Sequence, residues 1–305
     1  MMARRQKLRF NARRDIPIYI ILLPGILLLF IFHYLPIGGI VISFQKFSPF
    51  RGITGSPWIG FDNFKYFLND LNFWRVFRNT IIINIMQILI GFPAPIIFAI
   101  LLNELWSRSF KKVVQTISYL PHFISWVVAA SIITSVLSPS SGIINQALGL
   151  FGAEPVFFLA KSEYFRMIIV ITAIWKEMGM QAIYYIAALS AIDQDLYEAA
   201  YVDGAGKIRQ TWHITLPGLI PMIVVLLVLK IGSLVNIGFE QIFLLYNPLV
   251  YNVGDVLSTY TYRLGILNAN FSLTSSIGLT QSIVNFILVY SANRFARKAV
   301  GWSLW

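Results

Sequence analysis

Residues 198–217 read EAAYVDGAGKIRQTWHITLP and connect two long apolar segments of the chain. The stretch opens with helix-forming residues, is interrupted by Gly204 and Gly206, and ends in an Ile-x-Leu-Pro sequence. Asp195 is a suitable N-cap and Glu198 follows three residues later, a spacing that resembles a capping box. The glycines allow the chain to reverse sharply. We therefore predict a helix over residues 196–203, a turn, and a second short helix over residues 207–213.

Local chemistry leaves two interpretations of this connection open. Pro217 suits the first turn of the following helix, where its missing N–H costs nothing, and in the simpler interpretation the segment is only a rigid connector. In the other interpretation it is a docking site for a soluble partner, because Ala199, Ala200 and Ala205 are small enough for a second surface to approach closely.

The composition is that of a membrane protein. Of the 305 residues, 57% are hydrophobic and 12% are charged, whereas a soluble domain carries about 25% charged residues. The net charge of +11 could indicate nucleic-acid binding, but the basic residues cluster outside the apolar segments, which fits membrane orientation better. The absence of cysteine excludes disulfides and cysteine catalysis. The three histidines lack metal-ligand spacing, and we expect no metal site.

Six segments are long and apolar enough to cross a bilayer, which takes about 20 residues. The first is too long for a signal-peptide core and has no Ala-x-Ala cleavage site, so we expect it to be retained. Prolines within several of them predict kinked helices in a packed bundle. The six predicted spans cover residues 17–44, 79–104, 112–137, 166–190, 217–238 and 275–294. The predicted fold is thus an all-α integral membrane protein, with a basic N-tail (residues 1–15), a transmembrane domain (16–295) whose main cytoplasmic loop is 191–216, and a C-tail (296–305).

The distribution of Lys and Arg predicts the orientation, because cytoplasmic loops retain positive charge. Basic residues concentrate in the N-tail and near residues 108–112, 207–209 and 294–298, while the loops 138–165 and 239–274 carry few. Both termini and the loop 198–217 are therefore expected in the cytoplasm. On the outer side, the aromatic-rich segment 58–80 predicts short amphipathic helices in the interface, and residues 138–152 predict a turn followed by a short helix.

Polar side chains inside spans four and five are candidates for a path through the membrane. A charge at the bilayer centre costs about 2.5–3.5 kcal/mol on insertion scales, so such residues are usually functional or paired. Aromatic faces stack on sugar rings, while amide and charged groups bind hydroxyls or carboxylates. The candidate path residues are Trp175, Lys176, Glu177, Gln181, Lys230 and Asn236; Asn84 and Gln87 of span two are further polar groups. Two alternatives stay open: a substrate path with a small positive excess that would favour acidic glycans, or internal pairing of Lys176, Glu177 and Lys230.

Nothing in the sequence predicts catalysis. There is no Gly-x4-Gly-Lys-Ser/Thr phosphate loop. The chain is therefore not expected to be an enzyme or to hold a cofactor, and any ATP used in transport must be bound by another subunit.

The pattern Glu198-Ala199-Ala200, Gly204, Ile214-x-Leu216-Pro217 resembles the EAA motif of binding-protein-dependent ABC importer permeases, in both spacing and position before the penultimate span. The resemblance implies a type I importer fold in which this loop is a coupling helix that enters a cleft on the ATPase subunit. The residues to which it assigns ATPase coupling are Glu198, Ala199, Ala200, Asp203, Gly204, Ala205, Gly206, Ile214, Leu216 and Pro217.

Segments 119–132 and 236–263 and the C-terminal Ser-Leu-Trp resemble one carbohydrate subgroup, the lipoprotein-linked polysaccharide permeases, so the likeness covers nearly the whole chain. It implies import of oligosaccharides, including acidic ones from pectin-like or alginate-like polymers, across a bacterial cytoplasmic membrane. The implied partners are a second, usually non-identical permease, two ATPase subunits that bind ATP and Mg, and an extracytoplasmic solute-binding protein.

Two other classes of function were weighed against this one. A secondary transporter would work without an ATPase and usually has two related halves, but residues 1–150 and 151–305 show no convincing repeat. A membrane scaffold that uses the loop only for docking would not need polar residues at mid-membrane.

Overall fold

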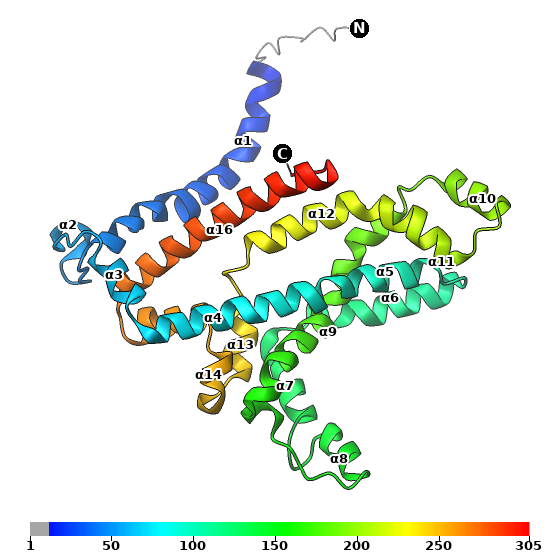
Figure 1. The fold of residues 1–305 in the computed structure, drawn as a ribbon. Coiled ribbons are helices and arrows are strands. Elements are labelled where there is room, and N and C mark those ends of the chain that lie inside the picture. Colours follow the sequence, from blue (N-terminus) through cyan, green and yellow to red (C-terminus); the bar gives the residue numbers. More distant parts are fainter. Residues whose placement is uncertain (1–11, 305) are drawn as a thin grey trace.

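The computed structural model describes residues 12–304, except for the side chains of residues 12–15, so most of the predicted N-tail lies outside the described residues. Apart from one isolated β-bridge between Gln45 and Trp58, every secondary-structure element in the described residues is helical, as predicted. Five helical segments are long and apolar enough to cross a membrane: Ile16–Phe44, Leu71–Asn103, Ser162–Leu189, Lys207–Gly232 and Phe271–Val300. A sixth is a bent pair of helices, so the six predicted segments are all represented (Figure 1).

Several spans are built from more than one helical piece. The first comprises α1 (Ala12–Leu29), the π-turn η1 (Phe30–Tyr34) and η2 (Leu35–Phe44); the second comprises α4 (Leu71–Met86), η3 (Gln87–Gly91) and α5 (Pro93–Asn103). The fourth is the uninterrupted α9 (Ser162–Leu189). The fifth comprises α11 (Lys207–Gln210), η5 (Thr211–Thr215) and α12 (Leu216–Gly232), and the sixth is α16 (Phe271–Val300).

Three π-turns each end two residues before a proline, which explains how these spans tolerate proline. Phe92 N donates to Gln87 O across 2.8 Å directly before Pro93. Leu35 and Leu216 close the equivalent turns before Pro36 and Pro217. Proline has no N–H and clashes with the preceding turn of an α-helix. A turn widened by one residue changes the register just before the ring, so the helix bends and continues.

The third span, predicted over residues 112–137 with Pro121 inside it as the source of a kink, is bent much more sharply than a kinked helix. α6 (Arg108–Phe123) and α7 (Trp126–Val136) meet at 105° (Figure 1). Pro121 removes a donor from the last turn of α6, and Ile124 is extended, at φ −80° and ψ 145°. The Ser125 hydroxyl then accepts a hydrogen bond from Val128 N at 3.3 Å and starts a new helix.

The outer segments are partly as predicted. α3 (Asp62–Leu68) is a short helix within residues 58–80, and α8 (Ile143–Gly149) is the short helix predicted after the turn in 138–152. The second span, however, starts at Leu71 instead of residue 79, because the Asp70 carboxylate accepts Asn72 N at 2.9 Å and caps the helix there. The remaining short outer elements are α2 (Gly52–Gly55), η4 (Phe158–Ala160), α13 (Phe239–Leu245), η6 (Pro248–Val250), α14 (Tyr251–Gly254), α15 (Leu257–Tyr262) and η7 (Arg263–Leu267).

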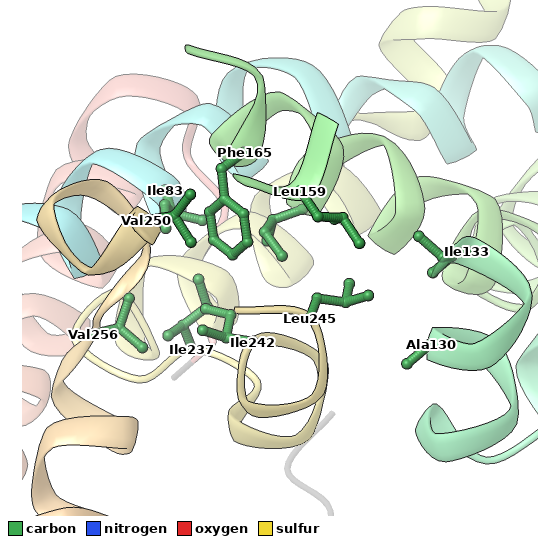
Figure 2. Packing of buried hydrophobic residues seen from close by; sticks show 11 residues of the cluster. Ile83, Ala130, Ile133, Leu159, Phe165, Ile237, Ile242, Leu245, Val250 and Val256 are labelled. Atoms are coloured by element: carbon green, nitrogen blue, oxygen red, sulfur yellow. The ribbon is translucent and has the colours of Figure 1, made fainter. Parts of the chain in front are cut away.

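The bend in the third span is packed against the outer part of the bundle. Ala130 and Ile133 of α7 share a buried cluster with Phe165 of α9 and Leu245 of α13 (Figure 2). Gly254 approaches the Phe165 ring so closely that a Cβ there would lie 2.4 Å from it. Through Ala130 and Ile133, α7 packs on α9 and α13. The first span, by contrast, leaves its apolar side chains exposed, as expected of a helix that faces lipid or another membrane chain.

Candidate functional site

The loop 191–216 forms a capped helix as predicted, with a different cap. α10 (Gln194–Val202) begins at Asp193, whose carboxylate accepts Asp195 N at 3.1 Å. The predicted N-cap at Asp195 was therefore wrong by two residues. The extended backbone needed at a cap is found at Asp193, at φ −63° and ψ 127°, while Asp195 lies in the first turn, where a carboxylate complements the helix dipole. Glu198 consequently makes no capping box, and its side chain is exposed.

Gly204 ends α10 in a Schellman motif. Its φ is +74°, Gly204 N donates to Tyr201 O at 3.0 Å, and Ala205 N donates to Ala200 O at 2.8 Å. Gly206 has ordinary extended angles, φ −66° and ψ 166°. Only the first of the two glycines is therefore required by backbone conformation.

The helix that follows the turn is the start of span five. Residues 207–213 were predicted as a separate short helix, which was wrong: Lys207–Gly232 is continuous over 26 residues. The Gln210 amide donates to Ala205 O at 2.9 Å, and the Tyr197 hydroxyl lies 3.0 Å from Thr215 Oγ1. A Cβ on Gly218 would lie 2.5 Å from Ile192 Cδ1, so span five packs tightly on the start of the loop. α10, its turn and span five thus form one connected unit.

This unit presents an apolar surface, which we call the loop knob: Leu196, Tyr201, Val202, Ile208 and Trp212, whose exposed fractions are 53–85%. Contiguous exposed apolar groups on one element usually mark an interaction site. A hollow of about 310 Å³ beside the knob is lined by residues that include Ala200, Asp203, Ala205 and Ile214. The other residues of the predicted coupling set are exposed or half-buried: Glu198, Ala199, Gly204, Gly206, Leu216 and Pro217.

Three of the six predicted path residues line one polar hollow of about 240 Å³ between spans two, four and five. Its polar wall comprises Gln87, Trp126, Glu177, Gln181, Lys230 and Gln241. The Lys230 ammonium donates to Gln87 Oε1 at 3.2 Å. Charged, amide and indole groups thus converge on a space that is large enough for a polar ligand group.

The other three candidates lie elsewhere. Trp175 lines a separate hollow of about 620 Å³ whose walls, from α7, α8, η4 and α9, are almost wholly apolar. Lys176 is 5% exposed and points to the bend of the third span. Asn236 is exposed in a non-helical segment, because span five ends at Gly232 instead of residue 238. The Asn84 amide donates to Leu234 O at 2.8 Å there, which satisfies backbone that has left the helix.

Lys176 and Glu177 clamp the bend between α6 and α7. The Lys176 ammonium donates to His122 O at 2.9 Å, a carbonyl that the end of α6 leaves without a helical partner. The same ammonium lies 5.3 Å from the centre of the Trp126 ring. His122 Nδ1 is 2.8 Å from Glu177 Oε2, and Lys176 Nζ is 3.7 Å from Glu177 Oε1. Internal pairing is thus partly correct: Lys176 pairs with Glu177, whereas Lys230 bonds to a glutamine.

α6 also crosses α9 at very short range. A Cβ added to Gly179 would lie 2.1 Å from the backbone oxygen of Ser118. Only glycine permits this approach, so α6 is held against α9 one helical turn away from the clamp.

Trp126 and Gln241 contribute to the hollow but were not predicted as path residues. Trp126 became a wall residue because the third span bends at that point. Gln241 lies in a segment that the sequence places in an outer loop; its amide donates to Ile169 O at 2.7 Å and to Thr172 Oγ1 at 2.9 Å. Polarity inside a predicted span did identify Gln87 as a further polar group, but neither the bend that places Trp126 nor the packing that places Gln241 has a comparable sequence signal.

The outer loop 239–270 is held by a buried ion pair. Both guanidinium NH groups of Arg263 donate to the fully buried carboxylate of Asp255, at 2.9 and 2.5 Å. This bidentate bond raises the pKa of Arg263 above its ordinary value. The Tyr260 hydroxyl donates to Asp70 Oδ2 at 2.6 Å, and burial together with this carboxylate raises the pKa of Tyr260. Within the described residues, no group of three or more His, Cys, Asp or Glu could hold a metal ion.

Comparison with known proteins places this geometry in context. The family described as "Binding-protein-dependent transport system inner membrane component" matches residues 91–300. The Bacillus subtilis (strain 168) protein LplB is 43% identical over 94% of this chain and 90% of its own length. The polygalacturonan/rhamnogalacturonan transport system permease protein YteP of the same organism is 41% identical over 97% of this chain and 92% of its own.

Solved structures agree with the sequence comparison. A bacterial ABC transporter involved in import of the acidic polysaccharide alginate contains a chain that matches with a TM-score of 0.88 and 40% identity, over 95% of this chain and 98% of that one. The alginate transporter in complex with an alginate pentasaccharide-bound periplasmic protein matches with a TM-score of 0.89 and 38% identity, over 98% and 100% of the two chains. The fold is therefore that of a type I ABC importer permease, as predicted.

Proposed function

The chain belongs to the family of binding-protein-dependent transport system inner membrane components, and we propose that it moves oligosaccharides by transmitting the motion of an ATPase partner along span five. As a permease subunit it forms half of the translocation path. The other half comes from a second permease, two ATPase subunits bind ATP and Mg, and an extracytoplasmic binding protein delivers the sugar. The membrane orientation is the one that the basic residues favour, with both termini and the loop knob in the cytoplasm.

One observation carries this proposal: the knob and the polar hollow share a single helix. Ile208 and Trp212 are exposed at one end of the continuous helix Lys207–Gly232, and Lys230 lines the hollow at its other end. The two ends are about 35 Å apart at 1.5 Å per residue. A displacement of the knob by a docked partner therefore displaces a charged wall of the hollow without any intervening loop.

The contacts around the loop support ATPase coupling by the predicted residues. The Schellman turn at Gly204 fixes the direction of α10, and Gln210 and Tyr197 tie it to span five. Ala200, Asp203, Ala205 and Ile214 line the hollow beside the knob. A partner side chain that enters this hollow would push on the connected unit.

Acidic oligosaccharides are the substrate class that we propose. Among the residues whose side chains the structure describes, the Lys230 ammonium donates to the neutral Gln87 Oε1 and forms no ion pair with a carboxylate, so a substrate carboxylate could bind to it. Gln181 offers an amide and Gln241 an amide oxygen for sugar hydroxyls, and the Trp126 ring offers a face for a sugar. The relatives named above include a permease for polygalacturonan and rhamnogalacturonan and an importer of alginate, which are acidic polymers.

Alternating access would use the bend in the third span. Glu177 lines the hollow, and its carboxylate also contacts the His122 ring at the end of α6. Trp126 is the first residue of α7 and lines the same hollow. A movement of the hollow walls thus changes the contacts that set the 105° angle between α6 and α7. The bend would open or close the path as the ATPases cycle, by rigid-body motion of packed helices.

Insertion of two glycines between Thr215 and Leu216 tests the mechanical link. The matched control inserts two glycines after Gly152, at an exposed outer turn. In the complete complex, the first insertion should preserve ATPase association and abolish ATP-dependent uptake, while the second should leave both unchanged. Wild-type uptake with the first insertion would overturn the proposal.

A further inference from the structure

A small basic hollow lies near the C-terminal end of α16. It encloses about 80 Å³ and is lined by Tyr290, Asn293, Arg294 and Arg297. These positions are spaced three and four residues apart, so they share one face of the helix. In the proposed orientation this is the cytoplasmic end of span six.

The returning C-tail contacts two of the residues that line this hollow. α16 ends at Gly301, whose φ of +76° reverses the chain. Leu304 N then donates to the buried Asn293 Oδ1 at 2.7 Å, and Arg297 Nε lies 3.3 Å from Ser303 Oγ. Leu304 also packs on Val224, Val228 and Ala296, between spans five and six. The hollow is thus a fixed feature of the fold, and Arg297 is oriented by the tail.

The two guanidinium groups favour an anion with several oxygens. Among residues 16–304, whose side chains the structure describes, neither Arg294 nor Arg297 forms an ion pair with a carboxylate. Both side chains are exposed and lie one helical turn apart. Paired arginines at this spacing can bind phosphate oxygens in bidentate fashion, and the Tyr290 hydroxyl adds a donor.

The same helix also provides an apolar surface that leads to this hollow. Ile283, Ile287 and Tyr290 are 50–55% exposed and lie at intervals of four and three residues, in line with Arg294. Phe286, which is 72% exposed, widens this strip. A free phosphate ion would gain nothing from such a strip, whereas the acyl chains of a phospholipid would lie along it.

We propose that this hollow binds the phosphate headgroup of an anionic phospholipid in the inner leaflet, with the acyl chains along the exposed face of α16. Basic pockets at the cytoplasmic ends of membrane helices bind acidic headgroups. The lipid would hold the C-tail and span six together, next to span five. The site depends on the proposed orientation and is independent of which sugar is carried.

The test uses the complete transporter in nanodiscs of phosphatidylglycerol and phosphatidylcholine, with retained lipid measured by native mass spectrometry after detergent extraction. The wild-type complex should retain phosphatidylglycerol in preference to phosphatidylcholine. The double variant Arg294→Gln/Arg297→Gln should lower this preference roughly 30-fold, because it removes two basic residues. The control Arg108→Gln/Lys112→Gln removes the same charge at exposed positions of α6 and should keep it.

Three outcomes would overturn the proposal. Equal retention by the Arg294/Arg297 variant and wild type would show that the hollow does not select the lipid. An equal loss in the Arg108/Lys112 control would indicate a general charge effect. Displacement of the bound species by millimolar inorganic phosphate, without a preference for phosphatidylglycerol, would assign the hollow to free phosphate. If the double variant does not assemble, the single variants Arg294→Gln and Arg297→Gln should each lower the preference about fivefold, and an unchanged preference in both assembled complexes would contradict the proposal.

Discussion

The Lys176 ammonium lies 2.9 Å from the carbonyl oxygen of His122, and this bond joins the fourth span to the bend of the third. The two residues are 54 positions apart in the chain. A buried cation is expensive in a membrane unless it is paired, and here it serves as the cap of a helix that ends inside the bundle. The neighbouring Glu177 contacts the His122 side chain and also lines the polar hollow.

Replacement of Lys176 by methionine should destabilise the chain by about 1–3 kcal/mol, because His122 O would lose its donor in a buried place. Methionine fills a similar volume, so packing changes little. Thermal unfolding of the detergent-solubilised complex measures the effect. The control Lys112→Met, at an exposed position of α6, should stay within about 0.5 kcal/mol; equal effects in the two variants would argue against the cap.

Gly179→Ala should destabilise the crossing of α6 and α9 by about 1–3 kcal/mol or more, because the added Cβ would lie 2.1 Å from a backbone oxygen that cannot move alone. Gly278→Ala is the matched control, since it is also inside a helix but has no heavy atom within 4 Å of the added Cβ. That variant should be neutral or slightly more stable. Thermal unfolding again provides the measurement, and a Gly179 variant as stable as the control would contradict the close approach.

Gly204→Ala and Gly206→Ala form a matched pair in the loop. The first places a side chain at φ +74° and should cost roughly 1–2 kcal/mol of local conformational energy. The second position has φ −66°, which alanine accepts. We expect the Gly204 variant to weaken co-purification with the ATPase and to reduce uptake, and the Gly206 variant to behave like wild type. If both variants couple equally well, the left-handed turn is not needed for docking.

Tyr260→Phe should change the response of the outer loop to alkaline pH. The folded-state pKa of Tyr260 is raised above the ordinary value of about 10, so its contribution to stability is complete below pH 10 and is lost as the pH rises through the folded-state pKa. The variant should lose about 1 kcal/mol at neutral pH through the missing bond to Asp70. Unfolding temperatures measured from about pH 8 to about pH 11 should then fall less in the variant; parallel curves would contradict the assignment.

The sequence predicted the six membrane segments and the turn at Gly204, because hydropathy and glycine chemistry act locally. Prolines, Pro121 among them, were correctly expected to kink spans, but the size of the bend after Phe123, 105°, was not predicted. Pro93 and Pro217 follow widened turns and leave their helices continuous, whereas the helix after Pro121 ends within three residues. The difference between these prolines lies in their tertiary contacts: Lys176 and Glu177, from another helix, stabilise the end of α6 after Pro121.

The candidate site was predictable in part, because polarity inside an apolar segment is also a local signal. Intramembrane polarity identified Glu177, Gln181 and Lys230, which do share a hollow. Trp175 and Lys176 are neighbours of Glu177 in sequence, but successive residues of a helix face different directions, so one meets an apolar hollow and the other the bend. Asn236 could not be placed, because the end of span five is set by amide groups of spans two and six.

The most direct test of the account is uptake of a labelled oligogalacturonate by proteoliposomes that contain the complete complex, measured with ATP, without ATP, and with Glu198→Lys in the loop. The account predicts uptake that requires ATP and the binding protein, and that is lost with Glu198→Lys because the ATPase no longer docks. Uptake at the wild-type level without ATP, or with Glu198→Lys, would contradict it.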